Sequence, residues 1–317
     1  MFTKDLKYCL LTWDKPENDF VKSFGDEQLP ISGLFLWKKA FDGAYAFPRT
    51  PDEFAEYDII HLNVTAKNLY LISKIIKDVR EAKRPKLLMN IDYSVDMWRP
   101  NFPYPQLLLQ EIDKADYIFG VEEEMCSILS DSLHREIACI PHPLDTIGLS
   151  ALRTTNRELR LLVSVHRYDL NFLTPWFAFK DLPRHIVTGC VGAFLAKDQC
   201  LHLYDEVQEH LNFDVLMKYT ASSYVALETY SISSYGRFSA ECAVLGVPCV
   251  GPSRVSSIRK CFPDLVSDTH ARTKELLHTL FSDNLFYISQ LEKGIDLSSQ
   301  YSIENSRNLM LSFLNRS

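Results

Sequence analysis

The sequence predicts a doubly wound α/β fold, built as two domains in series. Short apolar runs of four to six residues alternate with longer amphipathic segments, as buried strands and helices alternate in proteins with parallel sheets. This alternation stops within residues 142–159 and then starts again. The chain of 317 residues is also long enough for two cores of ordinary size.

The first half of the chain contains five strand candidates and three helix candidates. The strand candidates are apolar runs such as YDIIHLN and KLLMNID, and the helix candidates are longer and amphipathic. This order is typical of βαβ units, which make parallel sheets. The predicted strands cover residues 7–13, 57–63, 86–92, 116–121 and 137–141, and the predicted helices cover 65–83, 104–115 and 123–133.

Proline, threonine and charged residues interrupt this pattern in HPLDTIGLSALRTTNREL, residues 142–159. We therefore expect the domain boundary near 145–158, with a first domain of residues 1–148 and a second of residues 149–317. The second half of the chain repeats the pattern of the first. Its predicted strands cover residues 160–166, 184–190, 224–228 and 248–252, and its predicted helices cover 198–211, 213–222, 237–246, 271–283 and 302–316.

The composition is ordinary for a soluble globular protein, with 46% apolar and 24% charged residues. The net charge of −7 argues against nucleic acid as the main partner, because phosphate binding favours a basic surface. The eight cysteines form no C-x-x-C pair, so we expect buried thiols in a reducing cytoplasm and no metal site. We expect neither a signal peptide nor a membrane-spanning run, and the basic helix at 65–83 allows at most peripheral membrane contact.

A polar loop leads into an apolar helix in SSYGRFSAECAVLGVPCVGP, residues 233–252. A helix N-terminus offers unpaired N–H groups and partial positive charge, which favour a phosphate. Gly236 lets the backbone approach a ligand closely, while Arg237 can add a cation and Ser239 a hydroxyl. Glu241 lies about one turn in, where it could accept hydrogen bonds from vicinal ribose hydroxyls. The alternative is a helix in which Glu241 only complements the dipole.

The segment YGRFSAECAVLGVPCVGP resembles the donor-binding signature of GT-B glycosyltransferases, especially the large retaining family numbered four. That signature has an acid, Gly-Phe-Gly, a short spacer and then EAMACGVPVV. Glu241 matches its second acid, Gly246 its helix-ending glycine and Pro248 its strand-starting proline, and Gly236 matches the glycine beside the donor diphosphate. Upstream, YDIIHLN, KADYIFGVEEEM and REIACIPHPLDT resemble the family's N-terminal landmarks. The resemblance implies two Rossmann-like domains that face a central cleft.

The same resemblance implies that the second domain binds a nucleotide-sugar donor and the first an acceptor. Three departures weaken the match to a standard retaining mechanism: Ser233 replaces the first acid, no lysine follows Arg167 at the usual spacing, and no glycine-rich loop follows the first strand. Donor binding is therefore better supported than retention. The implied donor-binding residues are Arg167, Ser233, Tyr235, Gly236, Arg237, Phe238, Ser239 and Glu241.

Asp92 ends the strand KLLMNID, where the family commonly has a histidine that faces the donor. An aspartate there could act as general base on an acceptor hydroxyl, which an inverting transfer needs, and Asp96 is the alternative base. Asp92 could equally cap the turn that follows the strand. His142 and Asp145 lie at the interdomain turn and are candidates for the cleft or hinge. His142 and His61, which ends another strand, could each line the cleft, although a structural role suits either histidine better.

We therefore expect a nucleotide-sugar-dependent hexosyl- or pentosyltransferase that needs neither metal nor cofactor beyond its donor. The acceptor would be a glycan, a lipid-linked compound or a small molecule rather than nucleic acid. One alternative is a GT-B-like nucleotide-binding scaffold without transfer activity, which the Ser233 departure motivates. Another is a transferase of the viral type that glycosylates modified DNA bases.

Overall fold

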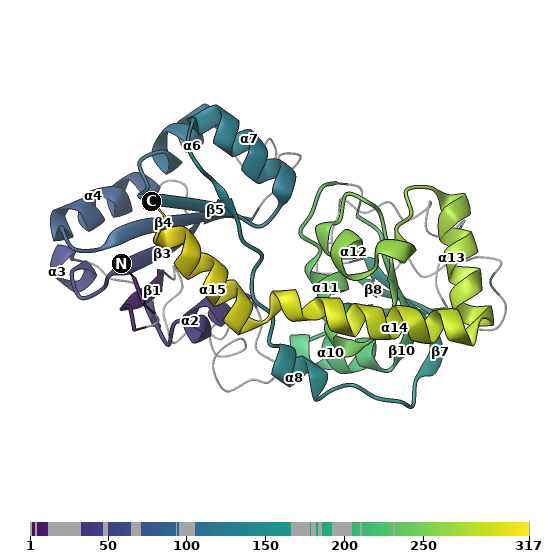
Figure 1. Cartoon of the computed structure of the whole chain (residues 1–317). Coiled ribbons are helices and arrows are strands. Elements are labelled where there is room, and N and C mark those ends of the chain that lie inside the picture. The colour runs from purple at the N-terminus through teal and green to yellow at the C-terminus, as the bar shows by residue number, and fades with distance from the viewer. Residues whose placement is uncertain are drawn as a thin grey trace. The chain divides into compact units, whose positions relative to one another are not determined.

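The computed structural model of the chain divides into two compact units (Figure 1). Unit 1 comprises Met1–Asp145 and Tyr301–Ser317, and unit 2 comprises Thr146–Gln300. The residues that the structure describes are 2–3, 5–11, 33–46, 50–64, 71–92, 94, 105–165, 178, 182, 186–191, 205–209, 211–230 and 232–316.

Unit 1 is built on a parallel six-stranded sheet with the order β2-β1-β3-β4-β5-β6. The chain runs outward from β1 to β2 and returns to β3 on the other side of β1, so the strand order reverses between β1 and β3. In open parallel sheets, ligands bind at the carboxyl ends of the strands beside such a reversal. The strands are β1 (Tyr8–Leu11), β2 (Ala44–Ala46), β3 (Ile59–Val64), β4 (Lys86–Ile91), β5 (Tyr117–Gly120) and β6 (Ala138–Cys139).

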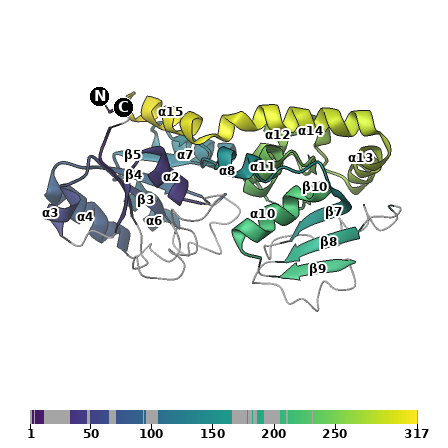
Figure 2. The ribbon, with the colours of Figure 1, turned by 90° about the horizontal axis from the view of Figure 1, so that it is seen from below.

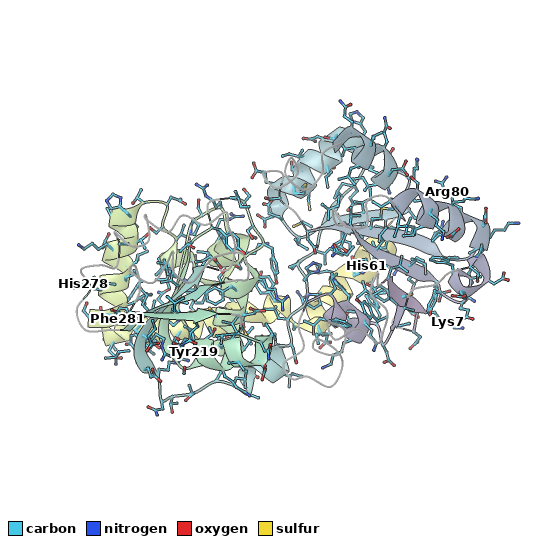
Figure 3. All side chains as sticks on the ribbon, turned by 180° about the vertical axis from the view of Figure 1, so that it is seen from behind. Lys7, His61, Arg80, Tyr219, His278 and Phe281 are labelled. Atoms are coloured by element: carbon cyan, nitrogen blue, oxygen red, sulfur yellow. The ribbon has the colours of Figure 1, made fainter. Side chains whose placement is uncertain are left out.

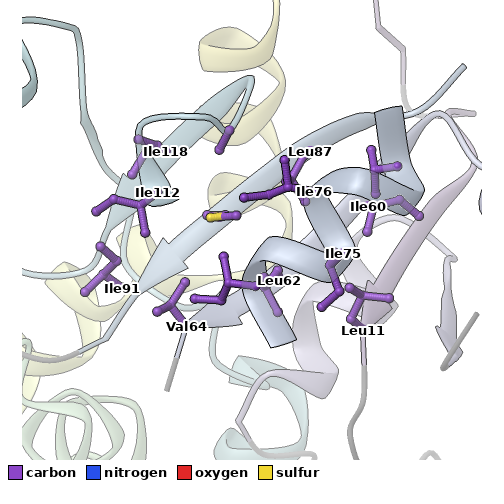
Figure 4. Close-up of a cluster of buried hydrophobic side chains, with 14 of the residues drawn as sticks. Leu11, Ile60, Leu62, Val64, Ile75, Ile76, Leu87, Ile91, Ile112 and Ile118 are labelled. Atoms are coloured by element: carbon purple, nitrogen blue, oxygen red, sulfur yellow. The ribbon is translucent and has the colours of Figure 1, made fainter. Parts of the chain in front are cut away.

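Helices cover both faces of this sheet, because successive strand residues alternate between two hydrophobic clusters. Cys9 and Leu11 join the cluster that packs against α4, whereas Tyr8 and Leu10 join the cluster that contains Trp37. Figure 4 shows part of the first cluster, in which side chains of α4 lie over β3 and β4. The helices of unit 1 are α2 (Phe35–Ala40), α3 (Pro51–Phe54), α4 (Ile72–Ala82), α6 (Pro105–Ile112), α7 (Glu123–Leu133) and α15 (Ile303–Leu314).

Unit 2 repeats the design with a parallel five-stranded sheet of order β11-β10-β7-β8-β9. Figure 2 shows β7, β8 and β9 side by side. The order reverses between β7 and β10, and β10 leads into the loop before α11. The strands are β7 (Glu158–Val165), β8 (Ile186–Val191), β9 (Glu206–Glu209), β10 (Ser223–Glu228) and β11 (Cys249–Val250). The helices are α8 (Thr146–Ser150), α10 (Phe213–Ala221), α11 (Arg237–Leu245), α12 (Ser256–Cys261), α13 (His270–Ser282) and α14 (Asn284–Ser298).

The last helix, α15, packs in unit 1 although it follows the six α-helices of unit 2 in sequence. Met310, Phe313 and Leu314 enter the cluster around Trp37, and Leu144 N donates to Tyr301 O over 2.8 Å. The division after Asp145 lies three residues before the predicted boundary at 148/149. Residues 301–317, however, belong with the first unit rather than the second, because the apolar stripe of α15 completes the core of unit 1.

One predicted element is wrong. Residues 198–211 were expected to form a helix, but Glu206–Glu209 form β9, which pairs with β8 from Thr188↔Glu206 to Val191↔Glu209. Pairing with an exposed strand edge overrides a weak local helix preference. Each of the other predicted strands and helices overlaps an observed element of the same type.

No helix in the described ranges combines the length and the apolar character that crossing a membrane requires. The exposed positions of α4 carry Lys74, Lys77 and Arg80. Lys77 pairs with Glu81 over 3.7 Å, so part of this basic face is balanced within its own helix.

Candidate functional site

Polar side chains gather at two places, one in each unit. In unit 2 the place is the N-terminus of α11, where Gly236 is the N-cap residue with φ of 77°. A Cβ on Gly236 would lie 2.2 Å from Val255 Cγ1 and 2.3 Å from Ser257 Oγ. Only glycine therefore fits here, for both conformational and steric reasons. Having no side chain, Gly236 cannot cap the first-turn N–H groups, which keeps them suited to an anion.

Serine hydroxyls hold the backbone of this turn in place. Gly236 O accepts from Ser257 Oγ over 2.6 Å and from Ser239 Oγ over 3.1 Å, and the two hydroxyls lie 2.6 Å apart. Ser234 Oγ accepts from Gly236 N over 3.2 Å. Ser239 is fully buried, so its hydroxyl shapes the turn from inside the unit.

Glu241 and Arg237 form an ion pair on the first two turns of α11. Arg237 Nε donates to Glu241 Oε1 over 2.7 Å, and the guanidinium lies 5.2 Å above the ring of Phe213. The side chain of Glu241 is 5% exposed and that of Arg237 is 35% exposed. Burial raises the pKa of Glu241, and the charge and hydrogen bond of Arg237 oppose this rise only in part.

The other predicted donor residues of unit 2 differ in how far they are exposed. Tyr235 and Phe238 are buried, whereas Ser233 is half-buried on the same loop. Arg167 lies outside the described residues. Glu228 was left out of the predicted site because it is out of register with the family's first acid, but its carboxyl group is buried at the carboxyl end of β10, just before this loop. Its position as the last residue of the strand YVALE was the available signal.

In unit 1 the polar cluster is centred on Asp92, which directly follows β4. Asp92 Oδ1 accepts from Asn90 Nδ2 over 2.5 Å and contacts His142 Nε2 at 2.8 Å. The side chain of Asp92 is 32% exposed and that of His142 is 12% exposed. A partly exposed carboxylate thus lies at the carboxyl ends of the strands, held from the interior by two side chains.

The partners of His142 fix its tautomer. Trp37 Nε1 lies 2.8 Å from His142 Nδ1, and an indole N–H can only donate. His142 Nδ1 must therefore accept, which leaves Nε2 to carry the hydrogen that is donated to Asp92. The Nε2–H of His142 is thereby oriented toward the carboxylate.

The same reasoning fixes a second branch, which runs through His61. Its Nε2 lies 2.5 Å from Asn90 Oδ1, an acceptor only, so Nε2–H donates and Nδ1 accepts from the hydroxyl of Tyr8. Asn90 Nδ2 then donates both to Asp92 and, over 3.0 Å, to Asn63 Oδ1. His61 is fully buried in the interior of unit 1 (Figure 3), in contrast to the surface residues Lys7 and Arg80.

These contacts set the charges of the network. Burial alone would raise the pKa of Asp92, but His142 and the donated hydrogen bonds outweigh burial, and the net shift is downward. Burial lowers the pKa of His61 to about 3, which keeps the imidazole neutral at ordinary pH. The network therefore directs hydrogen bonds from Asn90 and His142, with a neutral His61 behind Asn90, at one ionised carboxylate.

The structure brings some of the sequence-predicted residues of unit 1 into contact with one another. Asp92 and His142 are in direct contact, and His61 joins them through Asn90. Asp145 is buried at the end of the first segment of unit 1. Asp96 lies outside the described residues. Among those described, no group of three histidine, cysteine or acidic side chains could hold a metal ion.

Glu122, at the start of α7, is a helix cap. Its carboxylate accepts from Glu124 N over 2.9 Å and from Met125 N over 2.8 Å. Both carboxylate oxygens thus bind the first turn of its own helix.

The fold is similar to those of several solved glycosyltransferases. HepE (Alr3699) from Anabaena, solved with UDP, has a TM-score of 0.69 at 12% identity and covers 98% of this chain and 100% of its own. A glycosyltransferase from Rickettsia africae has a TM-score of 0.65 at 9% identity, with 98% of both chains covered. The trehalose-phosphate synthase of Burkholderia vietnamiensis has a TM-score of 0.64 at 12% identity and covers 84% of this chain and 77% of its own.

Comparison of sequences alone identifies no related protein. No family model matches the sequence, and no curated protein matches it. Identities of 9–12% accompany a structural likeness that extends over most of the chain. The chain therefore has the GT-B fold of glycosyltransferases in a strongly diverged sequence.

Proposed function

We propose that the protein transfers a hexosyl or pentosyl group from a nucleoside-diphosphate sugar to an acceptor hydroxyl. The observation that carries this proposal is the start of α11. There Gly236 is an N-cap residue without a side chain to cap the helix, and the buried carboxylate of Glu241 pairs with Arg237. The similarity to solved glycosyltransferases, one of them with UDP, supports it.

Unit 2 would bind the donor nucleotide. The first-turn N–H groups of α11 and the positive end of its dipole suit a diphosphate, and Arg237 adds a cation at the first helical residue. The hydrogen bond from Arg237 uses Oε1 of Glu241, which leaves Oε2 for a ribose hydroxyl. Ser239 would act indirectly, by holding the carbonyl of Gly236 so that the turn keeps its shape.

Unit 1 would supply the general base. Both described donors of Asp92 bind Oδ1, so Oδ2 is the atom that we assign to the proton of the acceptor hydroxyl. The nucleophile gains negative character as its proton moves to Oδ2, and the leaving nucleoside diphosphate takes the negative charge to unit 2. A base in this position suits transfer with inversion. The acceptor would be a glycan, a lipid-linked compound or a small molecule, and the reaction needs no cofactor beyond the donor.

Titration of the full chain with UDP, GDP and ADP by isothermal calorimetry tests donor binding. We expect one of them to bind, and Glu241→Gln to weaken its binding about tenfold, the loss of roughly one charge-assisted hydrogen bond. Glu122→Gln is the matched control, because it removes a carboxylate from a helix start in unit 1 without touching α11. Failure of all three diphosphates to bind would contradict the proposal.

Turnover of the corresponding nucleotide sugar tests the transfer itself. We expect release of free nucleoside diphosphate, accelerated by a suitable acceptor. Tight binding without any release would instead favour a nucleotide-binding scaffold, the alternative raised by Ser233 in place of an acid.

A further inference from the structure

Unit 1 contains a pair of thiols in contact near one edge of its sheet. Cys126 lies on α7 and Cys139 ends β6, and their side chains are hydrogen-bonded to each other. Cys126 is buried, whereas Cys139 is exposed. One cysteine of the pair thus lies at the surface of unit 1 and the other in its interior.

The sheet register accounts for this contact. Cys139 pairs with Gly120 of β5, so the two residues direct their Cα–Cβ bonds to the same face of the sheet. A Cβ on Gly120 would lie only 2.7 Å from Cys126 Sγ, which shows that this sulfur occupies the space left by the absent side chain. Cys126 Sγ also lies 3.5 Å from Ala138 O, directly before Cys139. Both sulfurs therefore meet on one face, over the end of β5.

The contact also distinguishes the two thiols chemically. The hydrogen bond to Cys139 raises the pKa of Cys126 far above its usual range, and burial adds to this rise. Cys126 is consequently protonated in the reduced pair and donates its S–H to Ala138 O, whereas Cys139 is the cysteine at an exposed position. An exposed thiolate beside a buried thiol is the arrangement of an attacking and a resolving cysteine.

We propose that Cys139 and Cys126 form a redox-active dithiol, which low-molecular-weight disulfides such as glutathione disulfide oxidise to an intramolecular disulfide. The Cys139 thiolate attacks one glutathione sulfur, forming a mixed disulfide and releasing one glutathione thiolate. Cys126 then passes its proton to the released glutathione thiolate as its sulfur attacks Cys139 Sγ, and the second glutathione leaves as a thiolate. Two protein thiols are oxidised and one glutathione disulfide is reduced to two glutathiones.

A second thiol pair in unit 2 provides an internal control. Cys242 on α11 and Cys249 on β11 are also hydrogen-bonded to each other, but both are fully buried. Contact between two sulfurs is thus common to the two pairs, while access for an oxidant is found only in the Cys126–Cys139 pair. We expect Cys242 and Cys249 to remain thiols under the same conditions.

The test is peptide mapping of the full chain after incubation with glutathione disulfide. Trypsin separates the two cysteines, because residues 115–135 and 136–153 are bounded by Lys114, Arg135 and Arg153. We expect these two peptides to appear joined, with the loss of two hydrogens, and to separate after treatment with dithiothreitol. Glutathione retained on Cys139 without cross-linking would overturn the proposal, and so would oxidation of Cys242 and Cys249 at the same rate.

Two variants test the order of events. Cys126→Ser should trap glutathione on Cys139, whereas Cys139→Ser should leave Cys126 unmodified for at least ten times longer than in the unaltered chain. Because Cys139 is exposed, its replacement does not disturb the core, so the second variant remains informative if the first folds poorly. Equal modification of Cys126 in both chains would show that Cys139 is not the entry point. None of these readouts needs a donor sugar, so the proposed transfer reaction can fail without affecting them.

Discussion

The fold shifts the pKa values of two carboxyl groups, Asp92 in unit 1 and Glu241 in unit 2, in opposite directions. Asp92 is 32% exposed and accepts from two oriented donors, and its pKa is lowered by His142 and by these hydrogen bonds. Glu241 is 5% exposed and has an arginine beside it, yet burial dominates and its pKa is raised. His142 and the directed hydrogen bonds thus outweigh burial at Asp92, whereas a single ion pair does not outweigh burial at Glu241.

The difference suits different tasks. A partly exposed carboxylate that stays ionised and whose described hydrogen bonds use only one oxygen can accept a proton from an incoming hydroxyl. A buried carboxylate that is costly to ionise gains most from a ligand that donates hydrogen bonds, as ribose hydroxyls do. We therefore assign catalysis to Asp92 and binding to Glu241, and the following predictions test that division in order of expected effect.

Asp92→Asn should have the largest effect. The amide has the same shape and its oxygen can still accept from Asn90 and His142, but it cannot take up a proton. We expect kcat for sugar transfer to fall by about 10²–10⁴-fold, with the Kd of the nucleoside diphosphate unchanged. Steady-state assays and calorimetry measure the two quantities, and Asp113→Asn, an exposed site in the same unit, is the control. A fall of less than threefold would remove Asp92 from the mechanism.

Lowering the pH should destabilise unit 1 through His61. Its pKa is about 3 in the folded state and near 6.5 when unfolded, so only the unfolded chain takes up a proton between these values. Stability is therefore full above pH 6.5 and falls by about 1.4 kcal/mol for each pH unit below it, or about 3 kcal/mol by pH 4. Hydrogen exchange in peptides of β3 and β4 should report this loss. His61→Gln, which cannot gain a charge, should remove that slope whatever its stability at neutral pH.

Gly236→Ala should destabilise unit 2 by about 2 kcal/mol, because alanine is strained at positive φ and its Cβ meets Val255 and Ser257. Nucleoside diphosphate binding should weaken in parallel as the turn before α11 shifts. Urea unfolding and calorimetry measure the two effects. Gly43→Ala serves as the comparison, since Gly43 is also crowded, by Tyr8, but belongs to unit 1, whereas α11 belongs to unit 2. If both variants bind the diphosphate equally well, the turn does not form the site.

The sequence predicts the residues of unit 2 better than it predicts the network of unit 1. Gly236, Glu241 and Gly246 lie within eleven residues, so one local motif specifies the loop, the helix and its left-handed C-cap. The network around Asp92 instead joins β1, α2, β3, β4 and the segment after β6. Asp92 and His142 could each be proposed from the sequence, but their contact spans fifty residues and depends on the strand order.

Trp37 illustrates the same limit. It lies on α2, a helix that the sequence pattern did not predict, and its indole N–H decides the tautomer of His142. The position of α15 was missed for a related reason. An amphipathic stripe shows that a helix must pack, whereas the choice of sheet depends on which core has an uncovered apolar face.

Glu241→Gln should have the smallest effect on stability and the opposite dependence on pH. A raised pKa in the folded state means that the folded chain binds the proton more tightly than the unfolded chain. The resulting stabilisation is full below the unfolded pKa near 4.5 and is lost as the pH rises through the folded pKa. Unit 2 should therefore become less stable as the pH rises through this window, by on the order of 1 kcal/mol, and Glu241→Gln should abolish the change. Hydrogen exchange in α11 peptides measures it. If unit 2 instead becomes more stable as the pH rises through this window, and only when Glu241 is present, the pKa of Glu241 must be lowered in the folded state, as that of Asp92 is. That result would contradict the different roles assigned to the two carboxylates.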